Sequence, residues 1–183
     1  MIIYAHGYHD SLQSGEKQKG FYLKNEHCAL TPDLPQLPSE SMSVLRSVIG
    51  RNLEKKPILV GHSLGGFYMT SLSQEFNLPA VLTNPVVYPY NSGVLAGLLH
   101  DQPELLREVK RQLKGIEQQL THPDNILTLL QKADEAQNYH DAELYYSPCN
   151  IVVLNGGSHK FDDFQCFLPI INYFRKRHYG ETS

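Results

Sequence analysis

One stretch of six residues decides the fold of this chain: Gly61-His62-Ser63-Leu64-Gly65-Gly66. A short apolar run, residues 58–60, comes directly before it, and a segment with apolar residues at helical spacing begins near Phe67. The pattern G-x-S-x-G between a strand and a helix is typical of a sharp turn that lifts the serine hydroxyl above a sheet. Glycine is needed on both sides of the serine because a Cβ there would collide with the neighbouring strand or helix. The stretch therefore predicts that Ser63 is a nucleophile.

Short apolar, β-branched runs alternate with helix-like segments along the rest of the chain. The expected strands cover residues 2–5, 58–60, 80–83, 126–130 and 151–154, with a weaker one over 27–30. The expected helices cover residues 39–53, 66–76 and 164–177. This alternation predicts an α/β fold in which a mostly parallel sheet of about six strands carries helices on both faces.

The length of 183 residues favours one domain over residues 1–183. One segment, about 88–123, interrupts the alternation with Pro and Gly turns and then a charged, helix-prone stretch over 104–119. Two interpretations of this segment are open. It is either a small helical cap, with the apolar residues of 94–99 facing a substrate, or a surface excursion whose leucines pack on the sheet. Because long insertions often carry function, we favour the cap.

Composition narrows the class of protein. Hydrophobic residues make up 41% and charged residues 19%, as in an ordinary globular protein. The net charge of -3, from 16 basic and 19 acidic residues, gives no electrostatic argument for binding nucleic acid or membrane. The chain starts without a targeting signal and has no membrane-spanning run, so we expect a cytoplasmic location. Cys28, Cys149 and Cys166 lack metal-type spacing and are expected to be reduced thiols.

A serine hydroxyl needs a base and a group that orients that base. On a sheet of this kind the partners follow in the chain order serine, acid, histidine, each just after a strand. His159 lies in a glycine-rich loop beyond the last expected strand, so we predict it as the general base. His140 precedes that strand, and His178 comes too late, in or beyond the last helix.

Two carboxylates follow the expected strand over 126–130, namely Asp134 and Glu135. Either could accept the Nδ1 proton of His159 and stabilise the imidazolium. Position favours Asp134 only weakly, and simple solvation is expected for the other member of the pair. Asp141 is a distant third candidate, on the surface of a helix.

The first strand ends in His6-Gly7-Tyr8, at the edge of the sheet where ligands of such folds bind. The backbone N–H groups of Tyr8 and Leu64 are the expected oxyanion-hole donors. His6 is expected to brace the loop by hydrogen bonds, and no carboxylate or cysteine completes a metal set, so neither a metal nor a cofactor is predicted. The residues expected at the substrate pocket lie at strand ends: His6, Gly7, Asn84 and Pro85.

These motifs together resemble those of the YqiA/YcfP-like small bacterial esterases of the α/β-hydrolase superfamily. The matching segments are residues 3–7, 35–38, 61–68, 78–81 with 84–85, 134–135 and 156–161. The resemblance is weakest over 91–123. It implies an α/β-hydrolase fold, esterase activity, Ser63 as nucleophile and His159 as base, and it supports Asp134 over Glu135.

The predicted function is a serine esterase that hydrolyses small, short-chain acyl esters through an acyl-enzyme intermediate. An acyl-CoA or carrier-protein thioesterase with the same triad is one alternative. A hydrolase fold that binds without catalysis is another.

Overall fold

The computed structural model describes residues 1–8, 29–116, 119–161 and 164–181. Six strands form one parallel sheet in the order β2-β1-β3-β4-β5-β6. The strands are β1 (Ile2–Ala5), β2 (Ala29–Leu30), β3 (Ile58–His62), β4 (Ala80–Thr83), β5 (Ile126–Gln131) and β6 (Asn150–Leu154). The predicted six-stranded parallel sheet is confirmed. Of the weakest predicted strand, residues 29–30 form β2, while residues 27–28, and Cys28 with them, lie outside the described residues.

Helices follow most of the strands. They are α2 (Pro38–Gly50), α3 (Leu64–Phe76), α4 (Gly93–Leu98), α5 (Pro103–Lys114), α6 (Tyr139–Tyr145) and α7 (Leu168–His178). The last helix starts later than predicted, because Phe164–Phe167 forms a 3₁₀ turn and Pro169 sits in the first turn of α7, where its missing N–H is harmless. No helix among the described residues is both long and apolar enough to cross a membrane.

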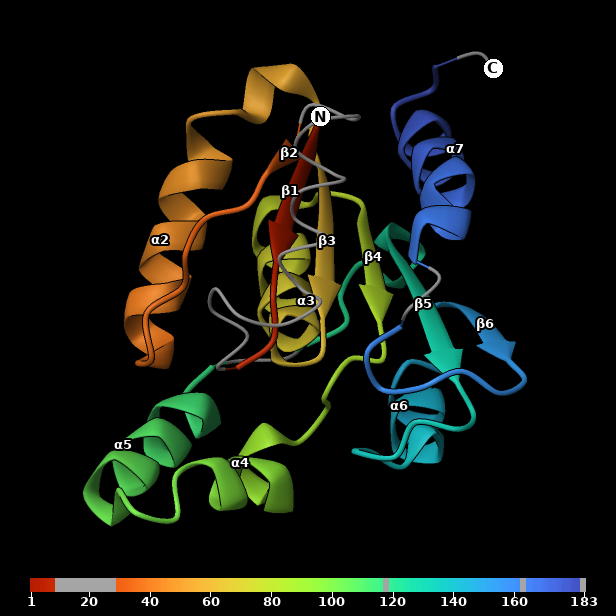
Figure 1. The fold of residues 1–183 in the computed structure, drawn as a ribbon. Helices are drawn as coiled ribbons and strands as arrows, with labels where there is room; N and C mark the ends of the chain where they lie inside the picture. The colour runs from red at the N-terminus through yellow and green to blue at the C-terminus, as the bar shows by residue number, and fades with distance from the viewer. Residues whose placement is uncertain (9–28, 117–118, 162–163, 182–183) are drawn as a thin grey trace.

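The strands separate two hydrophobic cores. Alternate residues of β1 point to opposite faces, so that Ile3 and Ala5 belong to one core and Ile2 and Tyr4 to the other. The first core is covered by α2 and α3 and the second by α7, which lies across the sheet from them (Figure 1). Burial on both faces explains why the strands are continuous apolar runs rather than alternating ones.

The carboxyl ends of the parallel strands meet at one edge of the sheet, and α4 and α5 lie beyond that edge (Figure 1). Both helices fall between β4 and β5, inside the segment predicted as a cap. Val109 and Leu113 of α5 are fully buried in the first core, whereas Val94 and Leu98 of α4 are about half exposed, at 46% and 47%. The two helices thus differ: α5 is anchored by its apolar side, and α4 presents apolar side chains at the edge where a ligand would bind.

Candidate active site

Ser63 lies at the junction of β3 and α3 with φ 52° and ψ −120°, a backbone conformation that residues other than glycine rarely adopt. Such strain persists only where the surrounding structure holds it. Here the Ser63 carbonyl accepts hydrogen bonds from the N–H groups of Gly66 (3.0 Å), Phe67 (3.3 Å) and Val86 (3.1 Å). The Ser63 N–H donates to the carbonyl of Thr83 at 3.2 Å. Both flanks of the turn are therefore tied to β4 and to the start of α3.

The glycines around Ser63 are required by close backbone contacts. A Cβ on Gly65 would lie 2.1 Å from the carbonyl oxygen of Ala5 at the end of β1. A Cβ on Gly61 would lie 2.5 Å from the carbonyl oxygen of Gly65. The expectation that glycine is needed at both places is confirmed, and Gly66 is equally constrained, since its Cβ would meet Pro85 at 2.7 Å.

Three side chains that are far apart in the sequence form one chain of hydrogen bonds. Ser63 Oγ and His159 Nε2 are 3.0 Å apart, and His159 Nδ1 lies 2.9 Å from Asp134 Oδ2 and 3.1 Å from Oδ1. An ionised carboxylate only accepts, so His159 donates from Nδ1 and Nε2 accepts the proton of Ser63. The side chains of Asp134 and His159 are 3% and 19% exposed, so the pair is largely shielded from water. This arrangement has the connectivity of a nucleophile, a base and an orienting acid.

Asp134 is fixed by the loop that follows β5. Its Oδ1 also accepts the backbone N–H groups of Ala136 at 2.8 Å and Gln137 at 2.9 Å. The carboxylate that faces His159 is thus oriented by its own loop.

Glu135 also contacts His159, contrary to the expectation that it is simply solvated. Its Oε2 accepts the backbone N–H of His159 at 2.9 Å. This hydrogen bond lowers the pKa of the Glu135 carboxyl from its ordinary value. The neighbouring acids consequently act on two parts of one residue, with Asp134 on the imidazole and Glu135 on the backbone. Both acids lie in the loop that follows β5, where the sequence predicted them, but the sequence could not show that a backbone N–H would point at Glu135.

The loop that carries His159 is hydrogen-bonded to two buried side-chain amides, those of Asn84 and Gln131. Asn84 Nδ2 donates to the carbonyls of Ser158 (3.0 Å) and His159 (3.3 Å), and its Oδ1 accepts the N–H of Gln131 at 2.9 Å. Gln131 Oε1 in turn accepts the N–H of Ser158 at 3.0 Å. Gly157 crosses this amide so closely that a Cβ on it would lie 2.2 Å from Gln131 Cδ. The sequence analysis did not predict a role for Gln131, although a polar residue at the end of an apolar strand could have indicated one.

Asn84 was expected to contact the substrate. Its side-chain amide instead hydrogen-bonds to the loop that carries His159, and the residue is 3% exposed. Its neighbour Pro85 lies beside Gly66. His6 braces its loop as expected: its Nδ1 donates to the Gly7 carbonyl at 2.7 Å, and its Nε2 accepts the Leu34 N–H at 3.4 Å.

A second histidine lies under the triad. His62 is buried, and its Nδ1 donates to the Thr83 carbonyl at 3.1 Å. Its ring packs 5.1 Å from that of His159, centroid to centroid. No role was expected for His62 from the sequence. In the structure its buried ring packs against the ring of His159, the predicted base.

A cavity of about 290 Å³ opens at Ser63. Both residues predicted as oxyanion donors, Tyr8 and Leu64, line it together with Ser63 and His159. The remaining lining residues come from two segments, one after β4 and one after Asp134. Most are apolar: Val86, Pro89, Ser92, Val94, Leu95, Leu98, Ala136 and Gln137. Helix α4 therefore forms a wall of the space in front of Ser63.

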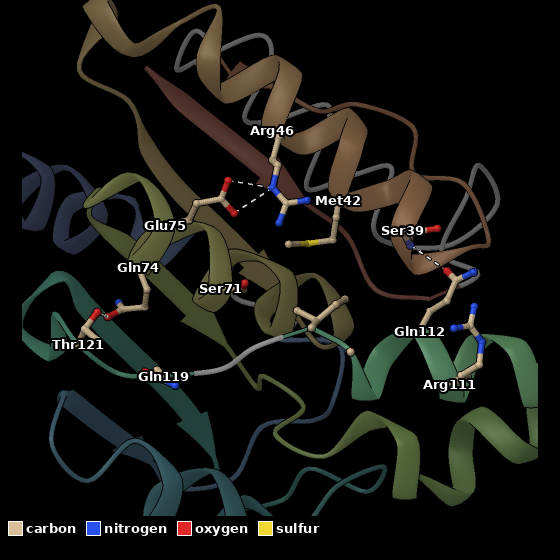
Figure 2. A pocket seen from close by; sticks show the side chains of 12 residues that line it. Ser39, Met42, Arg46, Ser71, Gln74, Glu75, Arg111, Gln112, Gln119 and Thr121 are labelled. Carbon is tan, nitrogen blue, oxygen red and sulfur yellow. Dashed lines mark hydrogen bonds and ion pairs between the residues drawn. The ribbon is translucent and has the colours of Figure 1, made fainter.

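A larger cavity, of about 730 Å³, lies between α2, α3 and α5, away from the triad (Figure 2). Two of its contacts join different helices: Arg46 pairs with Glu75 at 2.9 Å, and Gln112 Oε1 accepts the backbone N–H of Ser39 at 3.0 Å. None of the predicted catalytic side chains lines it. Among the residues the structure describes, no group of three metal-ligating side chains gathers in one place.

The all-parallel sheet, the strained serine turn and the order of the three partners define an α/β-hydrolase fold. Solved structures agree. Est1E from Butyrivibrio proteoclasticus superposes with a TM-score of 0.70, at 16% identity, over 98% of this chain and 88% of its own. A putative hydrolase from Agrobacterium vitis S4 gives 0.68 at 16% identity, over 98% and 86% of the two chains. At these identities the likeness concerns the fold.

The chain belongs to the uncharacterised protein family UPF0227, whose model matches residues 1–176. Family members include YcfP of Escherichia coli O9:H4 (strain HS), which is 26% identical over 96% of this chain and 98% of its own length. A UPF0227 protein of Enterobacter sp. (strain 638) is also 26% identical, with the same coverage. The predicted YcfP-like family and the predicted fold are both confirmed.

Proposed function

We propose that this chain is a serine esterase that hydrolyses small carboxylic esters. The observation that carries the proposal is the unbroken set of contacts from Ser63 Oγ through His159 to Asp134, at distances of 3.0 and 2.9 Å, at the mouth of a cavity. Side chains with these three roles, in this order along the chain, serve acyl transfer on α/β-hydrolase folds.

The geometry is suited to a two-step reaction. Ser63 Oγ attacks the acyl carbon while His159 Nε2 takes its proton, and Asp134 stabilises the imidazolium. The C–O bond to the alcohol then breaks, and His159 returns the proton to the departing oxygen. Water repeats the sequence on the acyl-enzyme and releases the acid. We assign the oxyanion to the N–H groups of Tyr8 and Leu64, where one donor typically contributes about 3–4 kcal/mol to the transition state.

The cavity supports a small substrate. Its volume of about 290 Å³ lies at the lower end for ligand pockets, which favours a short acyl group. We assign the segment 88–123 as a cap, since α4 contributes Val94, Leu95 and Leu98 to the wall. Est1E has been solved with ferulic acid bound, which is consistent with a small carboxylic acid occupying this kind of site.

The test is hydrolysis of p-nitrophenyl butyrate by the purified chain and two serine variants. We expect turnover by the wild type and loss of turnover in Ser63→Ala. Ser71→Ala is the matched control, because Ser71 lies on α3 and lines the cavity away from the triad. Circular dichroism should show that both variants remain folded. Equal turnover in Ser63→Ala and Ser71→Ala would remove Ser63 from the mechanism.

A further inference from the structure

A second cleft adjoins the cavity that contains Ser63. Its volume is about 330 Å³, and it lies between the segment after β4 and helix α6. The two spaces share four lining residues: Val86, Ser92, Ala136 and Gln137. An ester has two arms that leave the carbonyl carbon in different directions, so two adjoining spaces are what such a substrate needs.

The two spaces differ in chemistry. The cavity at Ser63 gains apolar side chains from α4, whereas the second cleft gains Asn91, Asn138 and Asp141. Among the described residues that line the second cleft, Asp141 alone carries a charge. Asn91 and Asp141 are exposed, and neither side chain makes a hydrogen bond within the described part of the chain. Their acceptors and donors are therefore available to a ligand.

The second cleft lies beside the loop that holds the acid. Two residues of the shared wall, Ala136 and Gln137, donate their N–H groups to the Asp134 carboxylate that binds His159. Ser63 and His159 line the apolar cavity and not the second cleft, so an ester whose carbonyl carbon lies at Ser63 would place only one of its arms in the second cleft. The predicted oxyanion donors, Tyr8 and Leu64, line only the apolar cavity.

We propose that the second cleft binds the alcohol arm of the ester, and that this alcohol is small, uncharged and carries several hydroxyl groups. The assignment rests on the proposed esterase function. Hydroxyl groups match Asn91 and Gln137, which offer donors and acceptors, and the acceptor-only carboxylate of Asp141. The Oδ1 of Asn138 already accepts the His140 N–H, and its amide NH₂ can donate. The polyanionic CoA arm of a thioester would meet the Asp141 carboxylate, and no Lys or Arg is found among the described residues that line the cleft. The same observations thus separate this substrate class from the thioesterase alternative.

The experiment compares kcat/KM for glycerol monobutyrate, propyl butyrate and butyryl-CoA. These share one acyl group, so only the leaving group varies. We expect glycerol monobutyrate to exceed propyl butyrate about tenfold, a ratio that one or two added hydrogen bonds produce, and to exceed butyryl-CoA by more. In Asp141→Ala and Asn91→Ala the ratio of the two oxygen esters should fall towards one, because glycerol monobutyrate loses more rate than propyl butyrate.

Glu143→Gln is the matched control, because Glu143 lies on the same helix as Asp141 but pairs with His140 outside the cleft. It should keep the wild-type ratio. Equal rates on the two oxygen esters in the wild type, or a preference for butyryl-CoA, would overturn the proposal and leave a general acyl hydrolase. Failure to hydrolyse any of the three would overturn the esterase function as well.

Discussion

Replacing Asn84 with alanine tests how His159 is held. Asn84→Ala removes two hydrogen bonds to the carbonyls of Ser158 and His159 and leaves the Gln131 N–H without its acceptor. At about 1 kcal/mol each, the three contacts sum to about 3 kcal/mol. Asn84 also has φ 42°, where alanine is disfavoured by about 1 kcal/mol. We therefore expect the free energy of unfolding to fall by about 3–4 kcal/mol.

The variant should also lose catalysis in a particular way. A catalytic group displaced by about 1 Å can lower the rate about 100-fold, so we expect kcat to drop between about tenfold and 100-fold. KM should change little, because Asn84 does not line the cavity at Ser63. Urea unfolding and steady-state hydrolysis of p-nitrophenyl butyrate measure the two effects.

Asn125→Ala provides the control. Asn125 is another buried asparagine, whose amide donates to Asn77 Oδ1 at 2.7 Å, and it precedes β5 at the opposite edge of the sheet. It should lose stability with kcat retained. If Asn84→Ala raised KM and kept kcat, Asn84 would contact substrate as the sequence suggested. If it lost stability alone, the loop would not depend on it for positioning His159.

Two further predictions concern single residues. Asp134→Asn should lower kcat by about four orders of magnitude. Glu135→Gln should lower kcat far less, because the Glu135 carboxylate accepts only a backbone N–H. Steady-state kinetics on p-nitrophenyl butyrate measure both values of kcat, and the reverse ranking would reassign the acid. Burial, and secondarily Asp124, raises the pKa of the Cys149 thiol to about 11, so at pH 8 it stays protonated and exposed Cys166 should react first with iodoacetamide. Peptide mapping follows both cysteines, and equal labelling would contradict the shielding of Cys149.

The parts of the site that follow from local rules could be predicted from the sequence. The turn at Ser63 is specified by its own glycines and by the apolar runs on either side. The loop of His159 follows from chain order, because parallel strands bring successive loops to one edge. Neither inference needs the direction of a side chain.

What could not be predicted depends on side-chain direction across long separations. Asn84 lies at the predicted edge, yet its amide turns to a loop 74 residues later in the chain. The hydrogen bond of Glu135 depends on the direction of the His159 backbone N–H. In the segment 94–99, Leu98 lines the cavity while Leu99 is fully buried in the core. The direction of each side chain at the end of α4 decides this difference, and apolarity does not.

The most direct test of the central claim is labelling of the purified chain with a fluorophosphonate, followed by mass-spectrometric mapping of the modified peptide. A serine made nucleophilic by His159 and Asp134 reacts with this probe. We expect a single modified residue, Ser63, and loss of labelling in His159→Ala. An unlabelled wild-type chain, or a label on another residue, would contradict it.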